Sequence, residues 1–422
     1  MFFSPASILG IWFRGLLSIA ILAGGIYLLY CWQAAPPTAT AVDRPIFERP
    51  AQDEPAETRD PPRFGDLRED WRPAWDESTA MLAGGLVLLA WGLLGGWIYP
   101  RPFRRSDGEG LDRDSTGGGE SLRLNRPDGT VLNVECHGPA DAPRLILTHG
   151  WGCDRRMWRP VQRQFADSYR IVVWDLPGLG ASSEPQNRDY SIAKMANDLR
   201  AVIEATGEQP AILVGHSIGG MISLTLCGLF TDLKRGPVAG LVLAHTTYTN
   251  PLKTMSYSAL LIMIQKPILE PLISLTILLS PLVWLMNGLS YLNGSAHRST
   301  ERQSFSGNET RGQLDFAARY SVKASPKVVA RGVRGMLRYD VTSALADIKV
   351  PAMVIVGDRD LTTKPEAGRY LKAQIPNASL ATLTPAKHLG FFEHHESFHQ
   401  SLQHFASETF AGRLAAKSRV PT

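Results

Sequence analysis

Two long runs of hydrophobic residues without a charge stand in the first quarter of the chain, at residues 15–32 and 81–99. Each is long enough to cross roughly 30 Å of hydrocarbon as a helix. Between them, residues 33–80 are rich in Pro, Asp, Glu and Arg and poor in aliphatic residues, a composition typical of a solvated connector. The pattern predicts a membrane anchor over residues 1–105, with two spanning helices joined by a polar loop.

Arginines near the ends of these runs predict their orientation. Arg101, Arg104 and Arg105 follow the second run, and Arg14 stands at the start of the first. Because Lys and Arg favour the cytoplasmic side, both ends of the hairpin are expected there. The alternative is that the first run is a signal peptide cleaved near residues 39–41, which would leave the second run as one span with the same cytoplasmic exit.

Three glycines of the second run, Gly85, Gly92 and Gly96, fall on one helical face. They could let the two helices approach closely, although glycine is common in membrane helices in any case. After the anchor, residues 106–120 are polar and Gly-rich and are expected to form a flexible linker. The main domain is predicted over residues 121–411, with a tail at 412–422.

Within the main domain, short apolar runs alternate with segments of helical spacing such as 192–205. A hairpin is predicted first, over residues 122–137, with its turn at Pro127-Asp128-Gly129. The apolar runs that follow are 145–148, 171–174, 211–214, 241–244 and 352–356. This order is the signature of an α/β fold in which a mostly parallel, doubly wound sheet is covered on both faces.

A serine between glycines follows the apolar run at 211–214. In Gly215-His216-Ser217-Ile218-Gly219 the serine stands between that predicted strand and a helix expected over 219–229. Such a tight turn needs glycine on both sides and lifts the hydroxyl above the sheet. A serine hydroxyl is a weak nucleophile until an imidazole takes its proton, so a histidine is required elsewhere. An ordinary Gly-rich turn is the alternative interpretation.

His388 is the best candidate base, because it follows the predicted strand 379–383 on a loop at the same edge of the sheet. It could otherwise be a surface histidine. Asp358 and Asp360 both follow the strand 352–356. We favour Asp360 as the acid that orients His388, because it lies further round the loop. The other acid would then be solvated or cap a turn.

These motifs resemble the α/β-hydrolase superfamily over residues 121–410. The loops at 149–152, 175–182 and 215–220 match the family's loops after its third and fourth strands and its nucleophile elbow, and the order Ser, Asp, His also agrees. The resemblance implies an oxyanion hole from the backbone N–H groups of Trp151 and Ile218, and a helical cap. Ser217 disfavours the epoxide hydrolases and haloalkane dehalogenases, which carry aspartate there. Lys387 departs from the pattern, since glycine is common before the histidine.

A competing motif, His395-Glu396-Ser397-Phe398-His399, matches the helical zinc motif H-E-x-x-H. Few residues follow it, which leaves little room for a third ligand and a substrate cleft. The same stretch fits a C-terminal helix with Phe398, Leu402 and Phe405 as its buried stripe. The histidines of this region are therefore expected at the surface, and neither a metal nor an organic cofactor is expected.

The insertion expected as the cap covers about residues 248–345. Its segment 260–286 is unusually apolar but contains three prolines, which argue against a third spanning helix. Two interpretations stay open: the segment dips into the bilayer interface, or it lines a deep apolar pocket. The arginines and lysines that follow could contact anionic headgroups or form a solvated face.

Charge excludes one class of partner. The chain has 44 Lys+Arg against 40 Asp+Glu, a balance that does not favour nucleic acid. The sequence therefore predicts an integral membrane serine hydrolase that cleaves lipid-like or acyl esters through an acyl-enzyme, with Ser217, Asp360 and His388 as its triad. The alternatives are other chemistry on the same fold, namely perhydrolase or haloperoxidase-like, thioesterase or carbon–carbon hydrolase activity, and a non-catalytic membrane scaffold.

Overall fold

The structure is a computed structural model that describes residues 5–35, 77–100, 119–230 and 237–418. It has two compact units, one of residues 1–18 with 94–422 and one of residues 19–93. The polar loop expected over 33–80 and the linker expected over 106–120 lie almost wholly outside the described residues, as does the possible cleavage site at 39–41.

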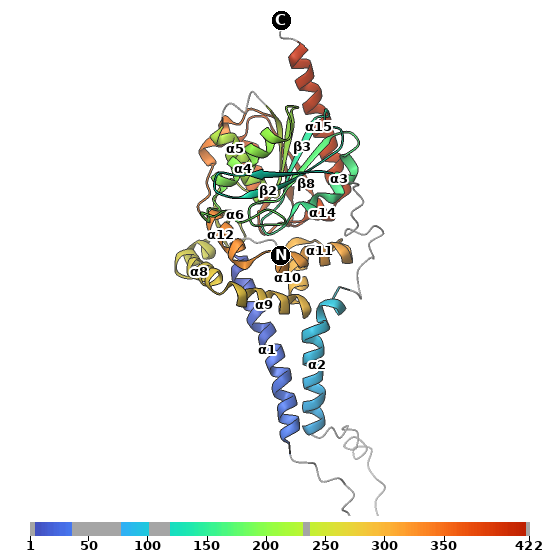
Figure 1. The fold of residues 1–422 in the computed structure, drawn as a ribbon, viewed down its shortest axis with the longest axis vertical. Helices are drawn as coiled ribbons and strands as arrows, with labels where there is room; N and C mark the ends of the chain where they lie inside the picture. The colour runs from blue at the N-terminus through green and yellow to red at the C-terminus, as the bar shows by residue number, and fades with distance from the viewer. Residues whose placement is uncertain (1–4, 36–76, 101–118, 231–236, 419–422) are drawn as a thin grey trace, which may run out of the picture. The chain divides into compact units, whose positions relative to one another are not determined.

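One sheet forms the centre of the first unit (Figure 1). In the described residues its strand order is β1-β2-β4-β3-β5-β6-β7-β8. Strands β1 and β2 form the hairpin, β2 pairs antiparallel with β4, and every later pair is parallel. The strands are β1 (Glu120–Asn125), β2 (Val131–His137), β3 (Arg144–Thr148), β4 (Arg170–Trp174), β5 (Ala211–His216), β6 (Val238–Ala244), β7 (Ala352–Gly357) and β8 (Ala378–Leu383).

Helices cover both faces of the sheet, as predicted, because its central strands are apolar on both sides. Along β3, Ile146 packs in one hydrophobic cluster, whereas Leu145 and Leu147 pack in the other. Figure 1 shows α4 and α5 on one face and α3 and α15 on the opposite one. These helices are α3 (Arg159–Phe165), α4 (Ile192–Ala205), α5 (Ile218–Leu229) and α15 (His395–Ser418), while α13 (Pro365–Gln374) packs on the α4 side.

The register of the parallel strands brings the loops that follow them to one edge. Thr148 at the end of β3 pairs with Gly215 on β5 and with Trp174 on β4. The residues that come next on each strand, among them Ser217, therefore emerge side by side, as the carboxyl ends of parallel strands do.

The cap lies along this edge of the sheet and is entirely helical in its regular elements (Figure 1). It comprises α6 (Pro251–Thr254), α7 (Ser258–Ile264), the π-helix η5 (Gln265–Leu269), α8 (Glu270–Leu278), α9 (Ser280–Leu292), α10 (Ser295–Ser304), α11 (Arg311–Lys323), α12 (Pro326–Met336) and the 3₁₀ segment η6 (Thr342–Asp347).

Two of the three prolines in the apolar segment of the cap lie within a continuous helix, although the sequence suggested that they break it. Helices α7, η5 and α8 run on continuously from Ser258 to Leu278. Pro267 lies in the π-helical turn, which absorbs an irregularity in the hydrogen-bond ladder, and Pro271 lies in the first turn of α8. Three described helices are long and apolar enough to cross a membrane: Ser7–Ala34, Glu77–Ile98 and Ser258–Leu278.

The first of these, α1 (Ser7–Ala34), begins inside the cap. Ile8 and Ile11 are buried in the same hydrophobic cluster as Leu269 and Ile273. The Trp12 Nε1–H donates to Thr276 Oγ1 at 2.9 Å, and the buried Arg14 donates to Ser299 Oγ at 2.9 Å. Ser18 continues this polar contact, 3.1 Å from Ser290 Oγ. The first turns of α1 are therefore part of the cap's interior.

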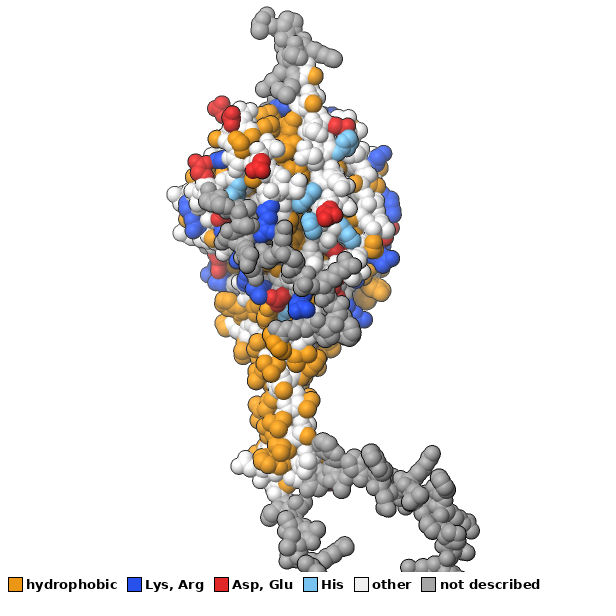
Figure 2. All heavy atoms as spheres, turned by 90° about the vertical axis from the view of Figure 1, so that its right-hand side faces the viewer, with side chains coloured by type: hydrophobic (Ala, Val, Ile, Leu, Met, Phe, Trp, Pro, Cys, Tyr) orange, Lys and Arg blue, Asp and Glu red, His pale blue; other side chains and the backbone are white. Residues whose placement is uncertain are grey.

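The second unit consists of the rest of α1 and most of α2 (Glu77–Ile98), and glycine brings the two helices together as the sequence suggested. A Cβ on Gly85 would lie 3.1 Å from the Gly25 carbonyl oxygen, and one on Gly92 would lie 2.6 Å from Leu22 Cδ2. Hydrophobic side chains such as Tyr30 and Val87 cover the outside of the pair (Figure 2).

Gly96 belongs to the first unit, where a Cβ on it would lie 2.1 Å from the Tyr291 carbonyl oxygen of α9. It therefore serves a contact with the cap. At the other end of the chain, α15 continues to Ser418, past the predicted domain end at residue 411.

Candidate active site

The bend at Ser217 between β5 and α5 is sharp and strained. Ser217 has φ 53° and ψ −116°, which non-glycine residues rarely adopt. A Cβ on Gly215 would lie 2.4 Å from the carbonyl carbon of Gly219, and one on Gly219 would lie 2.4 Å from the Thr148 carbonyl oxygen. The glycines on both sides are required by these contacts, and the serine is held in one place above the sheet.

The three residues chosen from the sequence meet at this bend. His388 Nε2 lies 3.1 Å from Ser217 Oγ, and His388 Nδ1 lies 2.8 Å from Asp360 Oδ2. Because a carboxylate oxygen only accepts, Nδ1 carries the proton and Nε2 is left to accept from the serine hydroxyl. This is the geometry in which an imidazole can take a proton from a nucleophile.

Asp360 is buried and surrounded by donors. Its Oδ1 accepts from the backbone N–H groups of Thr362 at 2.8 Å and Thr363 at 3.0 Å, and its Oδ2 accepts from Thr363 Oγ1 at 2.9 Å. Burial alone would raise the pKa of this carboxyl, but the neighbouring imidazoles of His388 and His245 more than offset that effect and hold the pKa well below its usual range. Asp360 is therefore ionised.

Asp358, the second acid of the same loop, caps a turn instead. Its Oδ1 accepts from the Ala386 backbone N–H at 2.8 Å. It thus steadies the start of the loop that carries His388, without contacting the imidazole.

The loop around His388 tolerates Lys387 because the backbone there does not adopt the left-handed region that favours glycine. The Lys387 ammonium donates to the Arg302 carbonyl at the end of α10. On the other side, His216 Nε2 lies 3.0 Å from the His388 carbonyl oxygen, so its N–H donates to that backbone group. The position of His388 is therefore fixed both from the cap and from the bend between β5 and α5.

The two expected oxyanion donors stand at the same edge of the sheet. Ile218 is the first residue of α5, so its backbone N–H points from a helix N-terminus and has no partner within the helix. Trp151 follows β3, and its indole N–H donates to the Val329 carbonyl of α12 at 3.0 Å, which fixes the loop.

His149 also fixes the conformation of the loop after β3 that carries Trp151. Its Nδ1 lies 2.9 Å from the Gly150 carbonyl oxygen, and its Nε2 accepts from the Leu176 backbone N–H at 3.0 Å. This bonding pattern requires the neutral ring. Burial lowers the pKa of His149 and favours the same state.

The sequence did not identify His245 as a site residue. Its Nδ1 lies 3.2 Å from Asp360 Oδ2. Thr246, the next residue, donates from Oγ1 to the Ser217 carbonyl at 2.6 Å. The available signal was position: both follow the predicted strand 241–244, at the edge where the other site residues emerge.

In the described part of the chain, one group of possible metal ligands converges: His245, Asp360 and His388, with ligand atoms within 4.8 Å of one another. The nitrogen that each imidazole turns to the group already donates to the carboxylate. Protons therefore satisfy this cluster, and its donor set fits a hydrogen-bonded triad better than a metal centre.

The H-E-x-x-H motif gains no third ligand side chain among the described residues. The rings of His395 and His399 meet edge to face with centroids 5.7 Å apart, and His399 packs edge-on against Phe165 at 5.5 Å. The expectation that His399 is a surface residue was wrong, because α15 turns it toward the α3 side of the core. Burial lowers its pKa to about 4.

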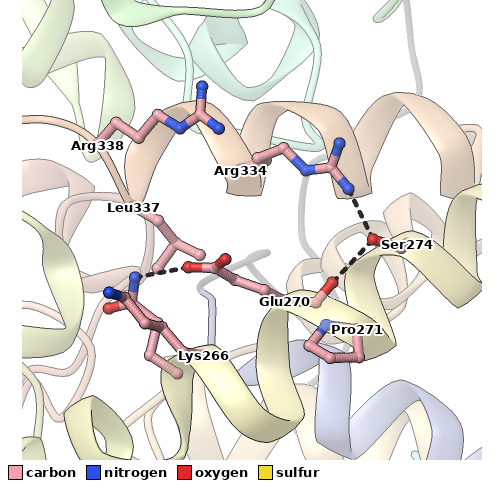
Figure 3. A pocket seen from close by; sticks show the side chains of 8 residues that line it. Lys266, Glu270, Pro271, Ser274, Arg334, Leu337 and Arg338 are labelled. Carbon is pink, nitrogen blue, oxygen red and sulfur yellow. Dashed lines mark hydrogen bonds between the residues drawn. The ribbon is translucent and has the colours of Figure 1, made fainter.

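A separate cavity of about 350 Å³ opens in the cap between α8 and α12 (Figure 3). Arg334 reaches from α12 to Ser274 on α8 at 2.9 Å, and Glu270 accepts from the Gln265 side chain at 3.0 Å. Lys266 and Arg338 also line it, so its lining contains three cationic groups and one carboxylate.

Comparison with known proteins agrees with this geometry. Residues 143–395 match the family model described as "alpha/beta hydrolase fold". The chain is 23% identical over 285 residues to 3-oxoadipate enol-lactonase 1 of Acinetobacter baylyi, covering 68% of this chain and 96% of the relative. It is 25% identical over 263 residues to the pimeloyl-[acyl-carrier protein] methyl ester esterase of Neisseria meningitidis serogroup B, covering 62% and 91%. The crystal structure of a hydrolase from Pseudomonas aeruginosa has the same fold, with a TM-score of 0.56 at 22% identity over 69% of this chain and 99% of that one.

Proposed function

The chain belongs to the alpha/beta hydrolase family, and from that premise we propose that it is a membrane-associated serine hydrolase that cleaves carboxylic esters through an acyl-enzyme on Ser217. One observation carries the proposal. A single imidazole, that of His388, lies within hydrogen-bond distance of both the hydroxyl of Ser217 and the buried carboxylate of Asp360.

The reaction follows from these contacts. Ser217 Oγ attacks the ester carbonyl carbon while its proton passes to His388 Nε2, and the carbonyl oxygen takes up the negative charge opposite the N–H groups of Trp151 and Ile218. When the tetrahedral intermediate collapses, His388 gives the proton to the departing alkoxide. Water then repeats the sequence on the acyl-enzyme and frees the acid. Asp360 stays ionised throughout and orients the imidazole.

We propose lipid-like or acyl esters as substrates. Two relatives are named for ester substrates, a lactone and a methyl ester. The cap here adds an apolar exterior: Met263 and Leu278 are 67% and 75% exposed, and Trp284 and Leu285 are also exposed. Exposed hydrophobic area of this kind is unfavourable on a surface that faces water. In the membrane–water interface it would instead be buried among lipids, and an ester with a long chain would have a short path to Ser217.

We also propose that α1 and α2 span a membrane, that the hydrolase domain lies on the cytoplasmic side, and that α7 to α9 dip into the interface. The arginine bias at the ends of the apolar runs supports the orientation. The cationic cavity of the cap (Figure 3) supports contact of the cap with anionic headgroups.

The enzymatic proposal is tested by labelling the full chain in detergent with a fluorophosphonate probe. The wild type is expected to label and Ser217→Ala is expected not to. Ser223→Ala is the matched control, because that serine is buried in α5 and donates to the Gly219 carbonyl. A folded wild type that never labels would favour a scaffold, and loss of hydrolysis with a chelator would revive the zinc interpretation.

The position of the cap is tested in bilayers that contain brominated lipids. A fluorophore is attached to Met263→Cys or Leu278→Cys in a Cys31→Ser background, and to Leu380→Cys as a control on the edge strand β8. Bromine is expected to quench the two cap sites and to spare the control. Equal, weak quenching at all three sites would show that the cap stays out of the interface.

A further inference from the structure

His245 directly follows β6, and its imidazole lies buried beside the triad. Its Nδ1 lies 3.2 Å from Asp360 Oδ2, the same oxygen that His388 Nδ1 approaches at 2.8 Å. Because that oxygen accepts only, both imidazoles must present an N–H to it. Asp360 is therefore held by two ring donors that come from two different loops.

The backbone and its neighbours fix His245 in this orientation. Its φ is 49°, in the left-handed region that few side chains tolerate and histidine reaches more readily than most. The backbone N–H of His245 donates to the Ile355 carbonyl of β7 at 2.8 Å. Gly390 packs against the His245 ring, and a Cβ at that position would lie 3.1 Å from His245 Cε1. The absence of a side chain on Gly390 therefore makes room for the imidazole. Strain of this kind is typical of functional sites.

The surroundings keep His245 neutral. The titratable groups that face it are Asp360, His388 and His216, with both imidazole centroids 6.1 Å from its own. Burial lowers the pKa of His245, and its hydrogen bond to Asp360 offsets only part of that effect. Two imidazolium rings at this distance would repel each other. Burial and this repulsion both favour the neutral form of His245.

We propose that His245 is a positioning residue for the reaction: its Nδ1–H holds Asp360 Oδ2 in place and draws part of the carboxylate's negative charge away from His388. This inference rests on the proposed function. Asp360 then cannot rotate away from the base. The imidazolium formed at His388 is also stabilised less than by an unshared carboxylate, so it gives up its proton to the leaving group more readily.

The test compares His245→Phe, which keeps a ring of similar size but loses the donor, with His245→Asn, which keeps a donor and tolerates positive φ. In His245→Phe the acidic limb of the kcat/KM pH profile is expected to move to higher pH by about 0.5 to 1 unit, because the unshared carboxylate stabilises the imidazolium more. His245→Asn is expected to move the limb back toward its wild-type position. A ring that only fills space would leave the limb where it is.

Profiles of wild type and His245→Phe that superimpose, with equal kcat, would overturn the inference. Should the variant fail to fold, nitrogen NMR of the wild-type full chain with labelled histidine decides: a proton on Nδ1 of His245 at neutral pH is expected, and a proton on Nε2 alone would overturn the assignment. If the pH profile of His245→Phe is unchanged but the enzyme still labels at Ser217, this inference fails and the proposed function stands. If the wild type never labels, the proposed function itself fails.

Discussion

At the scale of single residues, the candidate site is a chain of groups in which each one fixes the protonation of the next. Asp360 stays ionised because the imidazoles of His388 and His245 outweigh the effect of its burial, and the backbone and hydroxyl donors around it also favour the charged form. It therefore requires an N–H at Nδ1 of His388, and this leaves Nε2 as the acceptor for Ser217. A change that keeps the shape of the carboxylate but removes its charge should break this chain.

Asp360→Asn is expected to lower kcat by about 10³- to 10⁴-fold, because the amide can stabilise the wrong tautomer of His388 and no longer stabilises the imidazolium. Asp358→Asn is the matched control on the same loop, since Asp358 accepts from the Ala386 backbone N–H and is not bonded to His388. Steady-state hydrolysis of a short nitrophenyl ester measures both. Equal effects of the two substitutions would contradict the assignment of Asp360.

Buried histidines also predict how stability depends on pH. Burial lowers the folded-state pKa of His149, His216 and His399 below the value of about 6.5 in an unfolded chain. The folded state then binds fewer protons, so their contribution to stability is complete above about pH 6.5 and is lost as the pH falls below it.

Each such group adds a slope of up to about 1.4 kcal/mol per pH unit below that point. His399→Phe is expected to flatten the fall in denaturation midpoint between pH 7 and pH 5, because it removes one of the groups that must be charged on unfolding. His404→Gln is the control, since that side chain is 75% exposed. A fall that is unchanged by His399→Phe would refute this account of acid sensitivity.

Some of these residues could be predicted from the sequence and others could not. Ser217, His388 and Asp360 were found because each follows a strand end and carries a reactive group, and the structure brings them together. His245 follows a strand end too, but nothing in the sequence says which way its ring turns. His399 was placed at the surface because an apolar stripe does not show on which side a neighbouring histidine falls.

At the scale of elements, the fold follows from the alternation of short apolar runs and helical segments. Every predicted strand is present, and the central ones, such as β3 and β5, are buried along their whole length, as expected of continuous apolar runs in a parallel sheet. The cap was less predictable: prolines at 267 and 271 read as breakers, whereas a π-helical turn and a helix start accommodate them. Such local adjustments depend on packing that a pattern does not reveal.

The nucleophile elbow offers the sharpest test at this scale. Gly219→Ala is expected to destabilise the domain by about 3 kcal/mol, because the new Cβ would meet the Thr148 carbonyl of the adjacent strand at 2.4 Å. Gly288→Ala in α9 has open space around it and should stabilise by about 0.5 to 1 kcal/mol. Thermal melts in detergent compare the two. Similar shifts for both would show that the elbow is looser than the structure indicates.

At the scale of the whole molecule, the first helix is both a candidate span and part of the cap. Its opening turns bury Ile8 and Ile11 among cap residues and donate to Thr276 and Ser299. Removal of this helix, whether by processing or by truncation, would therefore leave an exposed groove in the cap. Two long apolar runs can be recognised from the sequence. The sequence does not show which part of each run packs against the domain and which part is left as a candidate membrane span.

Ile11→Ala is expected to lower the free energy of unfolding by about 2 to 4 kcal/mol and to raise KM, because it leaves a void beneath the cap. Phe13→Ala on the same helix is the control, since Phe13 is 70% exposed. Denaturation and ester kinetics in detergent measure both variants. A Phe13→Ala effect as large as that of Ile11→Ala would mean that α1 does not pack as described.

The central claim is that Ser217 carries the acyl group during turnover. The most direct measurement is to quench the full chain with acid during the burst on a slowly released ester and to map the added acyl mass to a peptide. The account predicts the acyl mass on the peptide that contains Ser217, and its absence in Ser217→Ala. Turnover of the ester with no acylated peptide, or with the acyl group on another residue, would contradict it.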